Sequence, residues 1–485
     1  MSADLGPYPA RKDSGVPWLG DVPEHWEVRP IGRIGQLFKG NGGSKGDEVP
    51  SGISCVRYGD LYTRHEFFIR STKACVTPEK ATDYTPIRYG DVLFAASGET
   101  VEDIGRSAVN LIESEARCGG DVLLLRPNIE VIPQFLGYAA ESTPSRHQKA
   151  CMGRGFTVVH IYSSQLKGLV VSLPPLPEQA AIVRFLDHAD RRIWRYIRAK
   201  QKLIKLLGEQ KQAIIHRAVT RGLDPNVRLK PSGVEWLGDV PEHWEVAPLK
   251  RMLRRLVDCE HKTAPAVDES EFRVVRTAAV RHGRLSWKGT YCTSEEAFRY
   301  WTQRATPEAG DVIFTREAPA GEACIVPEGR KVCLGQRTVL MKVARDKYDP
   351  QFLVHMIYAG PPRDRIRLAS QGSTVGHFNM DDIGWMVVLR PPLVEQREIL
   401  ADVQERTYGL EQARVRAESE IELLREYRTR LIADVVTGKL DVREVAAGLP
   451  DEAEEPEPLD EAEALSDVAD ATADDLDAAP EEVEV

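Results

Sequence analysis

The sequence predicts a mixed α+β protein built by duplication, in which two diverged, β-rich globular domains are each followed by one long helix. The two helices are expected to pair antiparallel in a pseudo-twofold arrangement, and a disordered acidic C-terminal tail follows them. Two observations predict this fold class. Residues 14–28, SGVPWLGDVPEHWEV, return at 232–246 as SGVEWLGDVPEHWEV, with a single difference. Two long helix-like patterns also occur, one after each of these segments.

Three shorter motifs occur twice at nearly the same spacing. They are GDVLF at 90–94 with GDVIF at 310–314, GFTVVH at 155–160 with GSTVGH at 372–377, and PPLPEQ at 174–179 with PPLVEQ at 391–396. Between these motifs the two copies barely resemble each other. Two unrelated domains that share a linker sequence are the alternative, which the additional motifs disfavour. One frame kept twice with different contents is expected of two sites that read two different targets.

Length and composition limit the class of protein. At 485 residues the chain is too long for one hydrophobic core, so several domains are expected. No apolar run approaches the roughly 20 residues that a membrane span needs. The eight cysteines form no C-x-x-C pair, which argues against a zinc site or a disulfide framework. We therefore expect a cytoplasmic protein with reduced cysteines and no bound metal.

The acidic charge of the sequence is concentrated at its end. Residues 446–485 hold sixteen Asp or Glu and no Lys or Arg, whereas the whole chain has 64 Lys and Arg against 74 Asp and Glu. The rest of the chain therefore carries a small excess of basic residues. The 446–485 segment has no aromatic residue and little to bury, so it is predicted to be a disordered tail. Its role is either solubility or competition with nucleic acid for the basic body.

The first half of the chain begins with a predicted flexible lead-in at residues 1–13. The first globular domain is expected to cover 14–175, and its opening segment predicts a packed strand and turn, because Gly20 and Pro23 lie between two tryptophans. Short runs bounded by Gly, Pro and Asp predict further strands, and a helix is predicted near 133–141. The strand-like runs are 53–58, 91–94 and 121–125.

The long helices are predicted at 176–224 and 393–445, on either side of a second globular domain at 225–392. Apolar residues recur every three or four positions from Pro177 to about Ala218 and from Val394 to about Val436, and the first of these runs would form a helix about 60 Å long. So narrow an apolar stripe on so long a helix needs a partner helix, and the simplest partner is the other copy. The repeated segment follows the first helix but not the second. If the halves are equivalent, the segment around Ser14 should lie near the end of the second helix.

Taken together, the W-L-G-D-V-P-E-H-W-E-V openings, the G-D-V-[LI]-F strands, the G-[FS]-T-V-x-H loops and the P-P-L-x-E-Q helix starts resemble the specificity (S) subunits of Type I restriction-modification systems. The resemblance covers about residues 14–441 and leaves out the acidic tail. It implies a DNA-sequence-specificity subunit in which 14–175 and 225–392 are target-recognition domains, each reading one half of a bipartite asymmetric site on double-stranded DNA.

The resemblance also implies partners and their cofactors. The helices would set the spacing of the half-sites and dock two methyltransferase (M) subunits, which restriction (R) subunits join. S-adenosylmethionine and ATP would bind to these partner subunits. This chain would be non-catalytic and would bind no cofactor of its own.

Motifs that would indicate catalysis are missing from the sequence. It contains no Walker-type G-x-x-x-x-G-K-[ST] and no [ND]-P-P-[YF] element of an adenine methyltransferase. The run Glu260-His261-Lys262 resembles the end of a nuclease triad, but Asp258 is too close to supply the distant carboxylate. Two alternatives remain beside the resemblance: an autonomous enzyme that acts on DNA, and a helical scaffold whose repeated domains bind other proteins.

Candidate DNA contacts are basic residues that differ between the copies, together with the repeated glycine-containing loop, whose backbone N–H groups could approach phosphates. A loop that merely connects strands, and Arg side chains that face water, are the alternative interpretations. Core or hydrogen-bonding roles are expected for His160 and His377. The DNA-binding candidates are Lys39, Arg57, Arg64, Arg70, Lys73, Arg154, Gly155, Thr157, His261, Lys262, Arg276, Arg281, Arg316, Arg337, Gly372, Ser373 and Thr374. The candidates for partner binding on the helices are Phe185, Ile193, Tyr196, Leu203, Leu207, Leu410, Ile421, Leu424 and Leu431.

Overall fold

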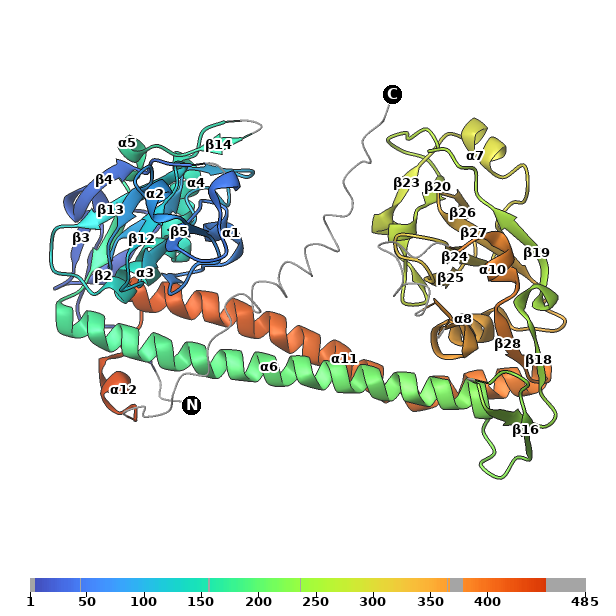
Figure 1. The fold of residues 1–485 in the computed structure, drawn as a ribbon. Helices are drawn as coiled ribbons and strands as arrows, with labels where there is room; N and C mark the ends of the chain where they lie inside the picture. Colours follow the sequence, from blue (N-terminus) through green and yellow to red (C-terminus); the bar gives the residue numbers. More distant parts are fainter. Residues whose placement is uncertain are drawn as a thin grey trace. The chain divides into compact units, whose positions relative to one another are not determined.

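A computed structural model of the chain describes residues 5–43, 45–155, 158–235, 237–363, 365–366 and 378–450. These residues form two compact units (Figure 1). Unit 1 holds the described residues up to Ala199 together with 419–450, and unit 2 holds those from Lys200 to Glu418. Each unit therefore contains one globular domain and part of both long helices.

Unit 1 is built around a five-stranded sheet with the strand order β4-β13-β9-β11-β6. The side chains of its central strand alternate between two apolar clusters. Val92 and Phe94 of β9 face one cluster, whereas Leu93 and Ala95 face the other, so both faces of the sheet are buried. The strands are β4 (Gly35–Lys39), β6 (Phe68–Ile69), β9 (Val92–Ala95), β11 (Ser107–Asn110) and β13 (Val122–Pro127).

Helices and a smaller sheet cover the two faces of this sheet. The helical side holds Phe135 of α3 and Phe185 of α6, and the other side packs on a sheet of order β7-β5-β12-β8. Two-stranded pairings β1-β2, β3-β15 and β10-β14 complete the unit. These elements are β1 (Arg11–Asp13), β2 (Asp21–Pro23), β3 (Glu27–Pro30), β5 (Ile53–Val56), α1 (Asp60–Thr63), β7 (Cys75–Val76), α2 (Pro78–Ala81), β8 (Thr85–Ile87), β10 (Ser97–Gly98), β12 (Ala116–Cys118), α3 (Pro133–Glu141), α4 (Thr143–Met152), β14 (Val159–His160), α5 (Ser163–Leu166), β15 (Val170–Leu173) and α6 (Leu176–Arg221).

Unit 2 repeats this plan with sheets of order β19-β27-β24-β25 and β23-β20-β26. Phe314 of β24 shares a cluster with Phe352 of α8, whereas Ile313 faces the smaller sheet. Its main elements are β16 (Leu229–Pro231), β17 (Asp239–Pro241), β18 (Glu245–Pro248), β19 (Leu253–Asp258), β20 (Phe272–Val275), β21 (Val280–Arg281), β22 (Arg284–Leu285), β23 (Thr290–Cys292), α7 (Glu295–Trp301), β24 (Val312–Thr315), β25 (Ala323–Ile325), β26 (Lys331–Leu334), β27 (Thr338–Val343), α8 (Pro350–Ala359), α10 (Met380–Gly384), β28 (Val387–Arg390) and α11 (Leu393–Val436).

The two long helices run antiparallel within each unit, as predicted. In unit 1, Arg428 of α11 pairs with Asp190 of α6, and its guanidinium also lies 2.7 Å from Glu66. In unit 2, Lys211 Nζ of α6 lies 3.0 Å from Glu411 Oε2 of α11. At 1.5 Å per residue, the 46 residues of α6 span roughly 70 Å. None of the helices in the described ranges is long and apolar enough to cross a membrane.

A glycine in the left-handed conformation follows each long helix and marks where the helix ends within the predicted segments 176–224 and 393–445. Gly222 has φ of +74° and Gly438 has φ of +72°, which is the usual arrangement beyond a helix C-terminus. Gly438 also lies close against the opening segment, because a Cβ added there would lie 2.3 Å from Pro23 Cδ. The predicted starts at 176 and 393 agree with the observed helices.

Two predicted flexible segments are partly ordered. In the lead-in 1–13, β1 pairs with β2, and Tyr8 is buried against Trp26. The predicted tail 446–485 begins a few residues too early, because α12 (Arg443–Ala447) buries Ala446 in the unit 1 core. Both errors have the same cause: Tyr8 and Ala446 make their buried contacts only in the folded unit, with residues far away in the sequence. Residues 451–485 lie outside the described residues.

Candidate functional site

A cluster of tryptophan, histidine and glutamate joins each globular domain to a long helix. Trp26 Nε1 donates to Glu178 Oε2 at 2.9 Å, and Trp244 Nε1 donates to Glu395 Oε1 at 3.0 Å. The histidine before each tryptophan lies 2.6 Å and 2.7 Å, respectively, from the same carboxylate. Both tryptophans are fully buried. The H-W of the repeated opening and the E of P-P-L-x-E-Q therefore form one structural contact, which the sequence showed only as two separate motifs.

The glutamine of P-P-L-x-E-Q accepts a hydrogen bond from the residue that precedes a helix of the globular domain. Gln179 Oε1 accepts from the backbone N–H of Ile132 at 2.8 Å, directly before α3. Gln396 Oε1 accepts from the backbone N–H of Asp349 at 2.8 Å, directly before α8. Both glutamines are buried. The motif thus anchors the globular domain rather than contacting a ligand.

The end of α11 lies against the N-terminal segment, as the repeat predicts. Ser172 Oγ donates to Val436 O at 2.7 Å, and the backbone N–H of Asp441 donates to Gly6 O at 2.9 Å. Gly438 packs beside Trp26 in the position that Gly222 holds beside Trp244. The two copies are therefore closed by the same junction.

The repeated G-D-V-[LI]-F strands also carry a structural aspartate. Asp91 is buried and accepts from Arg126 at 2.7 Å. Asp311 is buried and lies 3.3 Å from Lys342. Each carboxylate also caps the turn before its strand by accepting a backbone N–H. These shared residues hold the frame and leave discrimination to the parts that differ.

One end of the strands in each central sheet carries several of the candidate DNA contacts, and we call it the variable edge. In unit 1 it comprises the end of β4, the end of β9, the start of β13 and the described loop residues 153–155 and 158–160. Backbone hydrogen bonds of Ala96 with Asp121 (2.9 Å) and Ile161 (3.0 Å) join three of these segments. The exposed Lys39 follows on β4, with Nζ 3.8 Å from Asp121.

The glycine-containing loop reaches the variable edge in unit 1. Arg154 and Gly155 are exposed, whereas Thr157 lies outside the described residues. His160 Nδ1 lies 3.0 Å from Ser97 Oγ, which confirms its predicted hydrogen-bonding role. Sequence reasoning missed Tyr162, which is 57% exposed directly after the loop; an aromatic residue beside a basic glycine loop was the available signal.

The variable edge of unit 2 has the same backbone frame with other side chains. The backbone N–H of Arg316 donates to Arg337 O at 2.8 Å, and that of Phe378 donates to Arg316 O at 3.2 Å. His261 and Lys262 are exposed beside it. The loop candidates Gly372, Ser373 and Thr374, and His377, lie outside the described residues.

Arg316 is badly placed for base reading although it belongs to this edge. Its side chain is buried, and its guanidinium lies 2.8 Å from both carboxylate oxygens of Asp258. This pairing also occupies the aspartate that a nuclease interpretation would need. Arg337 remains exposed, with Nε 3.6 Å from Glu317. The sequence could not show the Arg316 pairing, because its partner lies 58 residues away.

The remaining basic candidates are spread over other surfaces. In unit 1, Arg57 pairs with Glu48 at 3.0 Å and Arg64 with Asp60 at 3.4 Å. Arg64 directly follows α1, and this helix contacts the variable edge, because Tyr62 OH donates to Ser97 O at 2.7 Å. Three further candidates lie elsewhere: Arg70 over the ring of Phe68, Arg276 over the ring of Tyr291, and Arg281 bonded to the carbonyls of Thr277 and Val280. Lys73 is exposed.

In the described ranges, no three His, Cys, Asp or Glu side chains are arranged to hold a metal ion. All eight cysteines are free thiols. Burial raises the pKa of Cys55 to about 11 and that of Cys118 to about 12, so both thiols stay protonated at neutral pH.

Four of the nine helix candidates serve the protein's own core. Phe185, Ile193, Ile421 and Leu431 are buried. Tyr196 is 54% exposed and Leu203 is 40% exposed, whereas three are half-buried: Leu207, Leu410 and Leu424. Exposed apolar residues that the periodicity missed are Leu206, Tyr408, Val415, Leu423 and Tyr427.

Comparison with known proteins adds independent evidence. Residues 23–206 match the model of the Type I restriction modification DNA specificity domain. The chain is 24% identical to a putative type I restriction enzyme MjaX specificity subunit of Methanocaldococcus jannaschii, over 88% of this chain and 96% of the relative. It is 20% identical to the type I restriction enzyme EcoKI specificity subunit of Escherichia coli, over 80% and 83%.

A solved chain from a study of complex assembly and conformational transition of the type I R-M system has the same fold. Its TM-score is 0.61 at 16% identity, over 86% of this chain and 99% of the other. The duplicated frame, the two long helices and these relatives lead to one conclusion: residues 23–206 carry a Type I restriction modification DNA specificity domain, and the chain is similar over most of its length to the specificity (S) subunits of Type I restriction-modification systems.

Proposed function

We propose that this chain reads a bipartite, asymmetric DNA site, with each globular domain recognising one half. One observation carries the proposal: the two units share the same backbone frame at the variable edge but present different side chains there. Unit 1 exposes Lys39 and Arg154, whereas unit 2 exposes His261, Lys262 and Arg337. Two unlike readers on one frame suit two unlike half-sites.

The chemistry of the variable edges fits nucleic acid. Lysine and arginine side chains donate hydrogen bonds to phosphate oxygens and to guanine O6 and N7, and loop backbone N–H groups donate to phosphates. An exposed tyrosine such as Tyr162 can pack against the sugar or base. Binding should weaken steeply with salt, because each neutralised phosphate releases counterions.

The partners we propose are two methyltransferase (M) subunits, which restriction (R) subunits join. Leu206 of α6 and Leu423 of α11 hold equivalent positions in the two copies and are 51% and 61% exposed. One surface that occurs twice suits a partner that binds in two copies. We assign S-adenosylmethionine and ATP to the partner subunits and a non-catalytic role to this chain. The helical scaffold that binds other proteins is not favoured.

The test is to co-purify the chain with its M subunit and map adenine methylation on genomic DNA. Lys262→Ala should weaken or relax one half of the methylated motif by about tenfold and leave the other half unchanged. Lys331→Ala, an exposed lysine on β26 that pairs with Glu271, is the matched control and should change neither half. Methylation that persists without this chain, or a failure to form the complex, would refute the proposal.

A further inference from the structure

A row of arginines on α6 has no counterpart in the second copy. Arg184, Arg191, Arg195 and Arg198 recur at steps of seven, four and three residues. At 100° per residue they lie within roughly 60° of one helix face, and we call them the arginine stripe. Arg184, Arg195 and Arg198 are exposed and Arg191 is half-buried.

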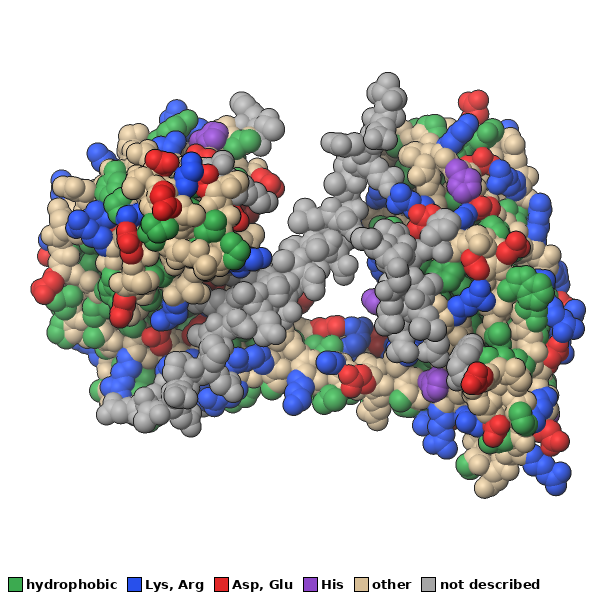
Figure 2. All heavy atoms as spheres, viewed as in Figure 1, with side chains coloured by type: hydrophobic (Ala, Val, Ile, Leu, Met, Phe, Trp, Pro, Cys, Tyr) green, Lys and Arg blue, Asp and Glu red, His purple; other side chains and the backbone are tan. Residues whose placement is uncertain are grey.

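The stripe lies opposite the face that α6 buries in unit 1, which carries Ile182, Phe185, Ala189, Ile193 and Ile197. The two acidic residues of this stretch are engaged in other contacts. Asp187 accepts from Tyr138 OH at 2.7 Å, Asp190 pairs with Arg428, and both carboxylates also interact electrostatically with Arg191 of the stripe. The outer face of this part of α6 is therefore strongly basic, and Lys and Arg side chains are visible along the long helices in Figure 2.

The repeat shows that this charge is not part of the shared frame. The positions of α11 that correspond to the stripe are Ala401, Tyr408, Gln412 and Val415. Over its whole length α6 has eleven Lys or Arg and four Asp or Glu, whereas α11 has seven and ten. A partner that binds both copies alike does not account for a basic stripe in one copy. Its occupant should be something that occurs once.

The acidic segment 451–485 occurs once, and the described residues that precede it lie beside the stripe. α12 is held to unit 1 by the burial of Ala446 and by Arg443 NH1, 3.6 Å from Glu178. Two residues later, Leu449 O accepts from Arg184 NH2 at 2.6 Å. The chain therefore reaches the first arginine of the stripe just before sixteen acidic residues begin.

We propose that the acidic segment 451–485 docks on the arginine stripe of its own chain and shields it from other polyanions. At about 3.3 Å per residue, 35 residues span more than the length of α6. Tethering gives the segment a local concentration of about a millimolar, so a weak contact is well populated. The segment has no aromatic residue, so the contact rests on charge and weakens with salt. The contact itself does not depend on the proposed DNA reading.

Zero-length carbodiimide cross-linking tests the contact directly in the full chain. Arg195→Lys and Arg198→Lys keep the charge and supply amines on the stripe. These positions should cross-link to carboxylates of 451–485 about fivefold more than the exposed Lys73 and Lys167 of the same unit. About 0.5 M NaCl should abolish the difference. Equal cross-linking at all four positions, or products between two chains, would overturn the proposal.

Shielding is tested with a fluorescent duplex of arbitrary sequence at low salt. A chain that ends at Pro450 should bind it about fivefold more tightly than the full chain. Replacing Arg191, Arg195 and Arg198 by Gln should remove that difference, because the segment then has no arginine stripe to shield from the duplex. A truncation effect of equal size in both backgrounds would contradict shielding of the stripe. Loss of site-specific reading alone would leave the cross-linking result intact and would count only against the proposed function.

Discussion

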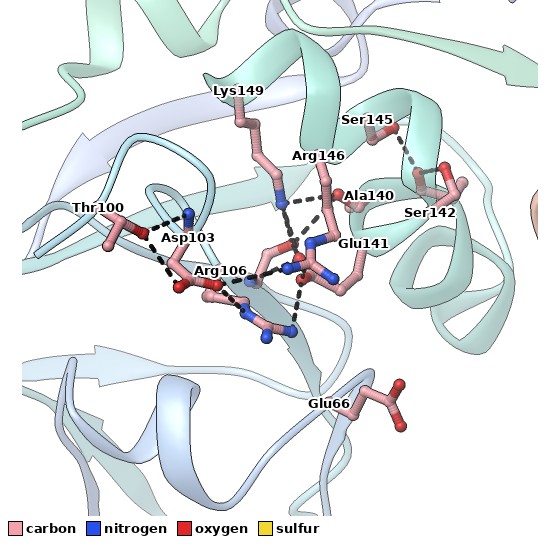
Figure 3. A network of polar contacts seen from close by, with 12 residues as sticks. Glu66, Thr100, Asp103, Arg106, Ala140, Glu141, Ser142, Ser145, Arg146 and Lys149 are labelled. Atoms are coloured by element: carbon pink, nitrogen blue, oxygen red, sulfur yellow. Dashed lines mark hydrogen bonds and ion pairs between the residues drawn. The ribbon is translucent and has the colours of Figure 1, made fainter. Parts of the chain in front are cut away.

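A buried ion-pair network unique to unit 1 allows a sharp test of how the variable edge is supported. Lys149 of α4 is fully buried, and its ammonium donates to Glu141 Oε2 at 2.7 Å, to Ser107 Oγ at 3.0 Å and to Ala140 O at 3.0 Å (Figure 3). Burial lowers the pKa of Lys149, and the neighbouring Glu141 carboxylate opposes this effect. α4 leads directly into the loop 153–160, so the network holds the base of that loop.

Lys149→Met removes the charge and keeps most of the volume. Breaking one side of a buried ion pair costs about 3–5 kcal/mol, because the other charge is left uncompensated. We expect about 3 kcal/mol, since Arg106 and Arg146 remain 3.4 Å and 3.6 Å from Glu141 Oε1. The double variant Lys149→Met with Glu141→Gln should lie within about 1 kcal/mol of the parent protein, because both fully buried charges are gone, whereas the partly exposed Arg106 and Arg146 still lie 3.5 Å and 3.4 Å from Asp103.

Hydrogen exchange of the β11 and α4 amides is the assay. A loss of about 3 kcal/mol corresponds to roughly 150-fold faster exchange, and peptides of β24 in unit 2 serve as an internal reference. Lys167→Met, at an exposed lysine in the same unit, is the control and should leave exchange unchanged. If the single and double variants are equally destabilised, the two charges are not coupled and the reasoning is wrong.

Three further predictions follow from the same structure. Burial lowers the pKa of His65 to about 4, so this histidine takes up a proton in the unfolded state before it does so in the folded state as pH falls. Its contribution to the free energy of unfolding should be complete above about pH 6.5 and fall by up to about 3 kcal/mol towards pH 4. His65→Phe should remove that part of the pH dependence of chemical unfolding. Glu395→Ala should destabilise unit 2 by about 1–3 kcal/mol, because the indole N–H of Trp244 loses its acceptor, whereas the exposed Glu398→Ala should not; equal thermal shifts would contradict the structural role of the junction. A circular permutant that joins residue 450 to residue 5 and opens at the exposed Pro225 should keep the circular dichroism spectrum and the cooperative unfolding of the parent, because the backbone of Asp441 already bonds to that of Gly6. An unfolded permutant would refute the equivalence of the two junctions.

The duplication and the helices could be predicted because they are written in local patterns. The predicted helix at 133–141 coincides with α3, since proline at the first turn and an apolar face set its limits. The prediction of a flexible lead-in at residues 1–13 was wrong for the described part of that segment, because Tyr8 packs against Trp26 in the folded unit. The candidate DNA contacts could be predicted less well than the helices, since the charge of a residue does not show whether its side chain is exposed.

What the sequence by itself determined is the repeated frame: identical segments at a fixed offset, and apolar spacing that fits long paired helices. These signals depend on neighbours in the chain. Only the tertiary structure decided which charged residues face solvent, because their partners come from distant segments. Arg316 is lost to Asp258, Lys149 is enclosed by Glu141 and Ser107, and Arg184 meets Leu449. The free energy of burying a charge depends on the groups that surround it in space, and no spacing in the sequence records that environment.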